Sequence, residues 1–348
     1  MAYASITKPS LQMNTKLYTG TGSSNALTGI GFQPDWVWLK ERNGGGGHNT
    51  FDAVRGATKV IYTNASNAEA TEAQALTSFD SDGFTLGTNT NVNESGINHA
   101  AWTWKANGQG SANTTGTINT TYTSANTTSG FSIIKYPGSG SNGTIGHGLG
   151  VAPSMVIIKD LSGTGDWLVG HDGLDATNPW HKYIYLNQGG AVADANTMFN
   201  DTAPTSTVIN LGTHSMTNGS GKNYICYAFA NVKGFSKFGK YGGNGNVDGT
   251  FVYTGFKPGF LAIKKTSDTG NWRQYDKLRL GFNPSNYNFQ ANTADQEETA
   301  VHVDLVSNGF KFRTSGGGEN DGSFIYMAFA EEPIVANVTS KGVPATAR

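Results

Sequence analysis

The chain has 348 residues, and its 24 lysines and arginines nearly balance its 25 aspartates and glutamates. Only 14% of the residues are charged and no basic stripe is present, so we expect no nucleic-acid partner. The 47 glycines and 11% aromatic residues are typical of short strands joined by turns.

The N-terminus has no basic region followed by an apolar one, and no apolar run approaches the roughly 18 residues of a membrane span. We therefore expect no signal peptide, no membrane insertion and synthesis in a host cytoplasm. The single cysteine, Cys226, lies in an apolar run and is expected to be a buried thiol. One thiol excludes an intramolecular disulfide.

One pattern recurs three times behind an N-terminal arm at residues 1–14. Each copy opens with Tyr-x-Gly-x-Gly and closes with an Ala-aromatic element. Between them lies a proline followed by an apolar run that ends in lysine. The prolines are Pro34, Pro153 and Pro258, and the lysines are Lys40, Lys159 and Lys264. Each copy is about a hundred residues long, enough for a core of its own.

Proline is tolerated at the start of a strand, so each proline motif predicts a strand just after it. The nearly continuous apolar character predicts a central strand covered on both faces, with the lysine marking the exit to solvent. Residues 65–76 are the only helix-compatible stretch, and a short helix or a loop turn both fit there. Residues 110–129 resemble a linker, but 116–123 alternate like an edge strand and are assigned to the second copy.

Short strands with turn signals every 8–12 residues favour antiparallel β-sandwiches of the jelly-roll type. We therefore predict an all-β chain of three tandem sandwich domains. Their expected bounds are 15–107, 108–232 and 233–334, with a C-terminal tail at 335–348.

Aspartate and arginine recur at Asp-x-x-Arg spacing in the first and third copies. The pairs are Asp52 with Arg55 and Asp276 with Arg279, whereas the middle copy has Asp172 and Asp175. An ion pair that fixes a strand end is favoured over a carboxylate that binds sugar or calcium.

Metal sites are not expected. The turn at residues 80–83 resembles the start of a calcium loop, but no glutamate follows at the EF-hand distance. His147, His171, His181 and His214 lack the spacing of zinc ligands. We expect no metal, no cofactor and no catalytic residue.

Four tryptophans pair at i, i+2, which places both members of a pair on one sheet face. They are Trp36, Trp38, Trp102 and Trp104. A core position is favoured over a sugar-stacking platform, because the other copies have aliphatic residues or phenylalanine there.

Ligand contact is instead assigned to aromatic residues on loops that differ between copies, where function tends to concentrate. These candidates are Trp180 and His181 in one Asn/Pro-rich loop, and Tyr287 and Phe289 in another. Contact with another subunit is an equally open interpretation.

The strings at residues 31–40, 51–56 and 78–84, together with the ending from 328 to 348, resemble a family of repeat proteins from marine bacteriophages. These are described as tail-fibre-like or other virion structural proteins with concanavalin A-like sandwich domains, and the resemblance covers essentially the whole chain. It implies a non-enzymatic virion protein, a tail fibre or tail appendage. Its partners would be other virion proteins, copies of itself with a trimer as one arrangement, and a host-surface glycan.

A capsid decoration protein is the second structural interpretation. A glycan depolymerase would need two carboxylates about 5–10 Å apart in a cleft, and no recurrent acidic pair suggests one. The arm and the tail lie outside the repeated units, so we expect one or both to contact another chain in the particle.

Overall fold

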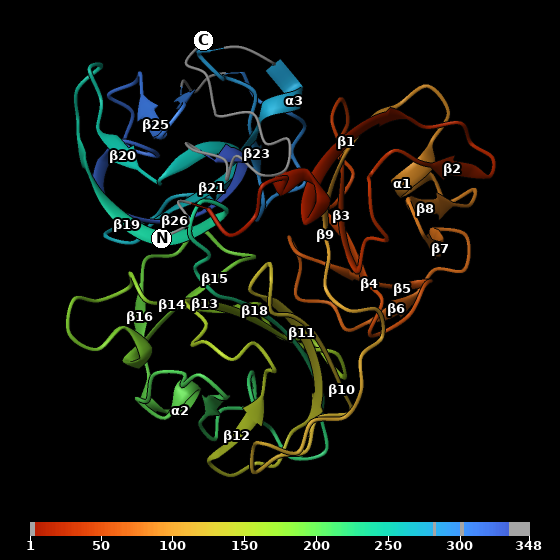
Figure 1. Cartoon of the computed structure of the whole chain (residues 1–348), viewed down its shortest axis with the longest axis vertical. Coiled ribbons are helices and arrows are strands. Elements are labelled where there is room, and N and C mark those ends of the chain that lie inside the picture. Colours follow the sequence, from red (N-terminus) through yellow and green to blue (C-terminus); the bar gives the residue numbers. More distant parts are fainter. Residues whose placement is uncertain (1–3, 281–282, 300–302, 334–348) are drawn as a thin grey trace.

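The computed structural model describes residues 4–280, 283–299 and 303–333. It confirms an all-β chain, in which all pairings between the named strands are antiparallel. Three lobes surround a common centre (Figure 1), and we define them as residues 13–104, 122–229 and 236–333. Each lobe has one large sheet and one smaller sheet.

In the first lobe the large sheet has the order β1-β9-β3-β4-β5-β6 and the small sheet the order β2-β8-β7. Its elements are η1 (Pro9–Leu11) in the arm, then β1 (Met13–Thr19), β2 (Asn25–Leu27), β3 (Trp36–Glu41), β4 (Asn49–Asp52), β5 (Lys59–Tyr62), β6 (Ala70–Thr71), β7 (Leu76–Asp80), β8 (Gly83–Leu86), α1 (Thr90–Asn93) and β9 (Asn98–Trp104). Residues 65–76 contain no helix.

In the second lobe the large sheet has the order β10-β11-β18-β13-β14-β15-β16, and β12 pairs with β17. Its elements are β10 (Tyr122–Asn126), β11 (Phe131–Pro137), β12 (Gly143–Gly146), β13 (Met155–Asp160), β14 (Leu168–His171), η2 (Pro179–His181), β15 (Lys182–Tyr185), β16 (Ala193–Asp194), α2 (Asn196–Phe199), β17 (Val208–Leu211) and β18 (Asn223–Phe229). The edge strand expected at residues 116–123 is largely wrong: β10 overlaps that range only at residues 122 and 123, and residues 116–121 form no strand apart from an isolated bridge of Ile118 to Ile145.

In the third lobe the large sheet has the order β19-β26-β21-β22-β23 and the small sheet the order β20-β25-β24. Its elements are β19 (Ser236–Asn244), β20 (Phe251–Tyr253), β21 (Phe256–Lys265), β22 (Arg273–Asp276), α3 (Lys277–Leu280), β23 (Phe289–Gln290), β24 (Val303–Val306), β25 (Gly309–Phe312) and β26 (Asp321–Pro333).

The three large sheets share one register. The residue two positions after the motif proline pairs with the closing strand in every lobe. These pairs are Trp36 with Trp104, Met155 with Phe229, and Phe260 with Phe329. Pro34 and Pro153 precede their strands, whereas Pro258 lies inside β21 at a β-bulge. The three prolines therefore occupy equivalent positions in the sheets.

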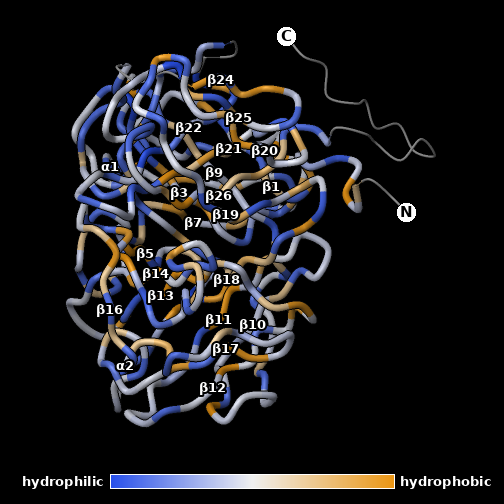
Figure 2. Tube along the Cα trace, turned by 90° about the vertical axis from the view of Figure 1, so that its left-hand side faces the viewer, coloured by the Kyte–Doolittle hydropathy of each residue, from blue (hydrophilic) through white to orange (hydrophobic). Residues whose placement is uncertain are grey.

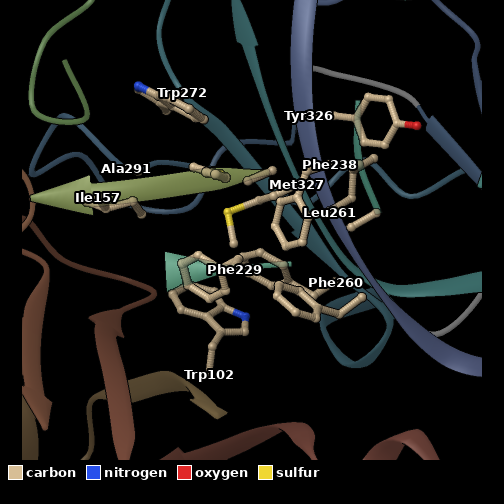
Figure 3. Packing of buried hydrophobic residues seen from close by; sticks show 14 of the residues in the cluster. Trp102, Ile157, Phe229, Phe238, Phe260, Leu261, Trp272, Ala291, Tyr326 and Met327 are labelled. Atoms are coloured by element: carbon tan, nitrogen blue, oxygen red, sulfur yellow. The ribbon is translucent and has the colours of Figure 1, made fainter. Parts of the chain in front are cut away.

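Alternation along each strand places one set of side chains toward the small sheet of the same lobe and the other set toward the centre. At the centre Trp102 of the first lobe, Phe229 of the second and Phe260 of the third pack together (Figure 3). All four tryptophans of the two i, i+2 pairs are buried in this one cluster. Their predicted core position is confirmed, and the core is one that the lobes share. Apolar stretches of the trace accordingly lie inside the molecule (Figure 2).

Candidate functional site

The first pair of candidate residues lies at η2 in the second lobe. Trp180 is only 2% exposed; its Nε1 donates to Asp172 Oδ1 at 3.0 Å and its ring packs edge-on against Phe199. The expectation that Trp180 is exposed is therefore wrong. His181 is half-buried, and its two ring nitrogens contact the carboxylates of Asp194 and Asp201.

The second pair lies in the third lobe and does not meet the first. Phe289 is fully buried, its ring 5.7 Å from that of Trp102, so its expected exposure is also wrong. Tyr287 is partly exposed. Among the four candidates, only His181 and Tyr287 keep an accessible surface, and they lie in different lobes.

The first Asp-x-x-Arg motif forms a buried ion pair, as predicted. Arg55 Nε lies 2.5 Å from Asp52 Oδ2, and both side chains are fully buried. The same carboxylate oxygen accepts a hydrogen bond from the Tyr227 hydroxyl at 2.7 Å. Tyr227 belongs to the second lobe, so this pair also joins two lobes.

The third lobe repeats the arrangement with the first lobe as donor. Arg279 Nε lies 2.6 Å from Asp276 Oδ2, and Trp102 Nε1 donates to that oxygen at 3.0 Å. The Arg279 guanidinium also lies 4.5 Å from the ring centre of Phe289. The carboxylates therefore hold the lobes together.

In the middle lobe the register corrects the sequence alignment. His171 pairs with Met155 as Asp52 pairs with Trp36, so His171 and not Asp172 is the counterpart of Asp52. Its Nε2 lies 3.2 Å from the carbonyl oxygen of Tyr326 in the third lobe. Burial lowers the pKa of His171 to about 4, so the ring is neutral at pH 7. Nδ1 accepts the Gly173 N–H at 2.8 Å, so the proton lies on Nε2, which donates. Asp175 instead accepts backbone hydrogen bonds from Thr177 and Asn178.

These contacts form a closed ring. The second lobe donates to the first through Tyr227, the first to the third through Trp102, and the third accepts from the second through Tyr326. A ring of backbone bonds runs beside it. Its donors are Glu69, Val192 and Glu297, and its acceptors are the carbonyls of Leu161, Thr266 and Arg42.

Two tryptophans near strand ends also donate hydrogen bonds across interfaces between lobes. Trp167 Nε1 donates to the carbonyl of Tyr62 in the first lobe at 2.8 Å. Trp272 Nε1 donates to the carbonyl of Tyr185 in the second lobe at 2.8 Å. Each tryptophan lies eight residues after its motif lysine, where the first lobe has His48.

The three motif lysines are fully buried, and the prediction that they mark an exit to solvent is wrong. Each ammonium group instead donates to backbone carbonyls. One is always that of the next residue, and the others are Gly44 for Lys40, Gly163 for Lys159, and Gly189 and Gly190 of the second lobe for Lys264. Lys40 bonds to Glu41 O at 2.8 Å, Lys159 to Asp160 O at 2.5 Å and Lys264 to Lys265 O at 2.7 Å. Burial lowers the pKa of all three groups to about 8.

These lysines predict a pH dependence of stability. Their folded pKa lies below the ordinary value of 10.5, so the unfolded chain binds more protons between about pH 8 and pH 10. The free energy of unfolding should therefore rise across that window, by about 1–3 kcal/mol per lysine. Urea titrations from pH 7 to 10 measure it. Lys159→Met should flatten the rise and exposed Lys8→Met should not, and a flat parent profile contradicts the prediction.

Sequence reasoning missed three buried asparagines that secure the Tyr-x-Gly-x-Gly turns. The Nδ2 groups of Asn93, Asn218 and Asn320 each donate to two or more backbone carbonyls. The motif tyrosines donate to the carbonyl just before each asparagine, at 2.6–2.7 Å. The recurrence of an asparagine shortly before each closing strand is the signal that could have identified them.

The acidic turn of the first lobe is structural. Asp82 accepts backbone hydrogen bonds from Gly29 at 3.0 Å and Gly31 at 2.6 Å, and these bonds lower its pKa. Within the ranges that the structure describes, no group of three or more His, Cys, Asp or Glu side chains is arranged to hold a metal ion. No helix in those ranges is both long and apolar enough to cross a membrane.

An open groove of about 580 Å³ lies on the surface where the second lobe passes into the third. It is lined by residues 231–234, 236–238 and 253–255. Tyr253 is 56% exposed, and Phe251, two residues earlier on β20, is 45% exposed. Lys237 Nζ donates to the Tyr253 carbonyl at 2.8 Å and lies 5.5 Å from the centre of its ring.

In the described parts of the chain, the site geometry thus consists of the interfaces between lobes and an apolar groove at the surface. No curated protein matches the chain. One family model, described as a domain of unknown function (DUF7483), matches residues 8–333, and the chain therefore belongs to that family.

Proposed function

We propose that this protein is a non-enzymatic structural component of a bacteriophage particle, a tail fibre or tail appendage, built from three jelly-roll domains of the concanavalin A-like kind. The observation that carries the proposal is the closed ring of bonds between lobes. Its recurrent buried groups, Asp52, Asp276 and His171, each engage a neighbouring lobe. Such a body is suited to displaying loops rigidly.

The resemblance of the repeated strings to marine bacteriophage proteins supports the location in a virion. Copies of the same chain and other virion proteins would be its partners. A host-surface glycan is the proposed ligand, and the accessible residues His181 and Tyr287 lie on loops available to it. The proposal includes no cofactor.

The location is tested on purified particles of the phage that encodes this chain. We expect mass spectrometry to detect the protein, and immunogold labelling to place it on the tail. Labelling on the head would favour a decoration protein, and absence from the particles would refute a structural role. Variants lacking residues 1–13 or 337–348 should fail to incorporate. If both incorporate normally, the ends are not assembly elements.

Host binding is tested separately from architecture. A glycan array should show selective binding by the intact protein, and His181→Ala or Tyr287→Ala should weaken it if those loops make the contact. Release of reducing ends from host polysaccharide would instead reveal a depolymerase.

A further inference from the structure

The groove lies beside a sheet edge that is paired only at its first residue, Ser236, whose outward N–H and C=O bond to Val232. β19 is the edge strand of the third large sheet, whereas β11, its counterpart in the second lobe, is paired on its outer side with β10. The correspondence follows from the motif tyrosines, since Tyr136 lies on β11 and Tyr241 on β19. The second lobe therefore has one strand at a place where the third has none among the described residues.

In the second lobe β10 fills the position that corresponds to the groove. Thr123 of β10 donates from Oγ1 to Gly146 O at 3.4 Å, and Ala125 lies close against Gly148. Gly146 is the last residue of β12, and Tyr253 is the last residue of β20. The two residues occupy equivalent positions in the small sheets of their lobes. Tyr253 and the turn after it line the groove. The groove in the third lobe thus corresponds to the position that β10 occupies in the second lobe.

The edge of β19 offers backbone groups to an added strand at Lys240, because the outward groups of Ser236 and the N–H of Phe238 are already hydrogen-bonded. The Phe238 N–H donates to Asn231 Oδ1 at 2.8 Å, and so points away from the paired strand β26. Because backbone direction alternates along a strand, the N–H of Lys240 points the same way. Lys240 is exposed, and its counterpart Lys135 pairs with Tyr122 of β10.

The repeat serves as an internal control for the aromatic residues beside the groove. In the common register Phe251 and Tyr253 correspond to Ala26 and Thr28 in the first lobe. The second lobe has Thr144 and Gly146 there. The fold therefore does not require two exposed aromatic rings at this edge, and they suit contact with an apolar partner.

We propose that the groove receives the C-terminal tail of a second copy of this chain, as an added strand antiparallel to β19. The expected tail and the residue before it, together residues 334–348, form a segment longer than the five-residue β10, and it begins Ile-Val-Ala-Asn-Val-Thr-Ser. This run is rich in β-branched residues, which favour strands, and its Thr339-Ser340 matches Thr123-Ser124 of β10.

Strand direction favours a second copy over the same chain. A strand that runs like β10 enters opposite Lys240 and runs toward Ser236, ending before it because Val232 already pairs with that residue. Ser236, at the exit end of the groove, pairs with Phe329 of β26. The strand β26 continues past Phe329 to Pro333, so the tail of the same chain begins beyond that exit end. The tail of the same chain would have to run back along the groove before it could enter, and a neighbour's tail has no such constraint. Head-to-tail strand addition of this kind builds chains of subunits.

This inference deepens the proposed assembly role and rests on it, but it is tested on the isolated protein. Analytical ultracentrifugation of the full chain should show concentration-dependent association below about 100 µM. A variant that ends at Pro333 should remain monomeric. A labelled peptide of residues 334–348 should bind that truncated variant in fluorescence anisotropy.

A matched pair of variants locates the binding. Lys240→Pro removes the outward N–H of β19 opposite which the added strand would enter, a change that edge strands tolerate, and should weaken peptide binding about tenfold. Lys240→Thr keeps the N–H and should bind the peptide as the parent does. Association that survives removal of the tail, a full chain that stays monomeric, or equal peptide affinity of both variants would overturn the inference. A protein that associates through its tail but is absent from virions would refute only the proposed function.

Discussion

Replacing Asp52 with alanine should lower the free energy of unfolding by about 3–5 kcal/mol, because it leaves the buried guanidinium of Arg55 without its main partner. Asp52 Oδ2 lies 2.5 Å from Arg55 Nε, and Oδ1 accepts the Arg55 backbone N–H at 2.8 Å. The remaining acidic neighbour, Glu69, lies 3.4 Å from the guanidinium. Urea unfolding followed by circular dichroism measures the loss.

Two further variants distinguish the contribution of the Asp52–Arg55 ion pair from that of the hydrogen bond between lobes. Tyr227→Phe removes only the hydroxyl that reaches Asp52 from the second lobe, and should cost about 1 kcal/mol. In the Asp52→Ala background that substitution should cost less, since its acceptor is already gone. Asp175→Ala, a local turn carboxylate in the middle lobe, should cost less than about 1 kcal/mol. A loss below 1 kcal/mol for Asp52→Ala would contradict the buried-pair interpretation.

The strands and their repetition could be predicted because periodicity and turn chemistry are local. The Asp-x-x-Arg pairs at Asp52 and Asp276 were predicted too, because three-residue spacing brings the charges together at a strand end. The shared centre could not be predicted. Alternation shows that Trp36 and Trp38 lie on one face, but the partner that covers this face is far away in sequence.

The prediction that the three motif lysines reach solvent failed for another physical reason. A lysine at the end of an apolar run has the same sequence whether it reaches water or bonds to carbonyls of its own loop. Lys40 and Lys159 take the second course through Gly44 and Gly163, whereas Lys264 bonds to Gly189 and Gly190 of the second lobe, a contact that lies far away in sequence. Residue type aligns Asp172 with Asp52 and Asp276, whereas strand pairing shows that His171 is their counterpart, and the sequence alone does not reveal that register.

The shared centre also predicts how the lobes unfold. Trp36 is fully buried at the seam of the first and second lobes, with its ring centre 4.6 Å from that of Tyr227 and 4.4 Å from that of Trp104. Trp36→Ala should lower the free energy of unfolding by about 3–5 kcal/mol, through lost burial and the cavity it leaves. Because the cavity opens between lobes, the loss should reach beyond the first lobe.

Hydrogen–deuterium exchange with mass spectrometry follows that spread, because protection of core amides reports the free energy of opening. In Trp36→Ala, peptides covering β13 and β21 should lose protection together with those covering β3. Val247→Ala, at a side chain that is 66% exposed, should leave all three unchanged. Loss of protection confined to the first lobe would mean that the lobes open independently. In that case the bonds at Asp52, Asp276 and His171 align the lobes without making them one cooperative body.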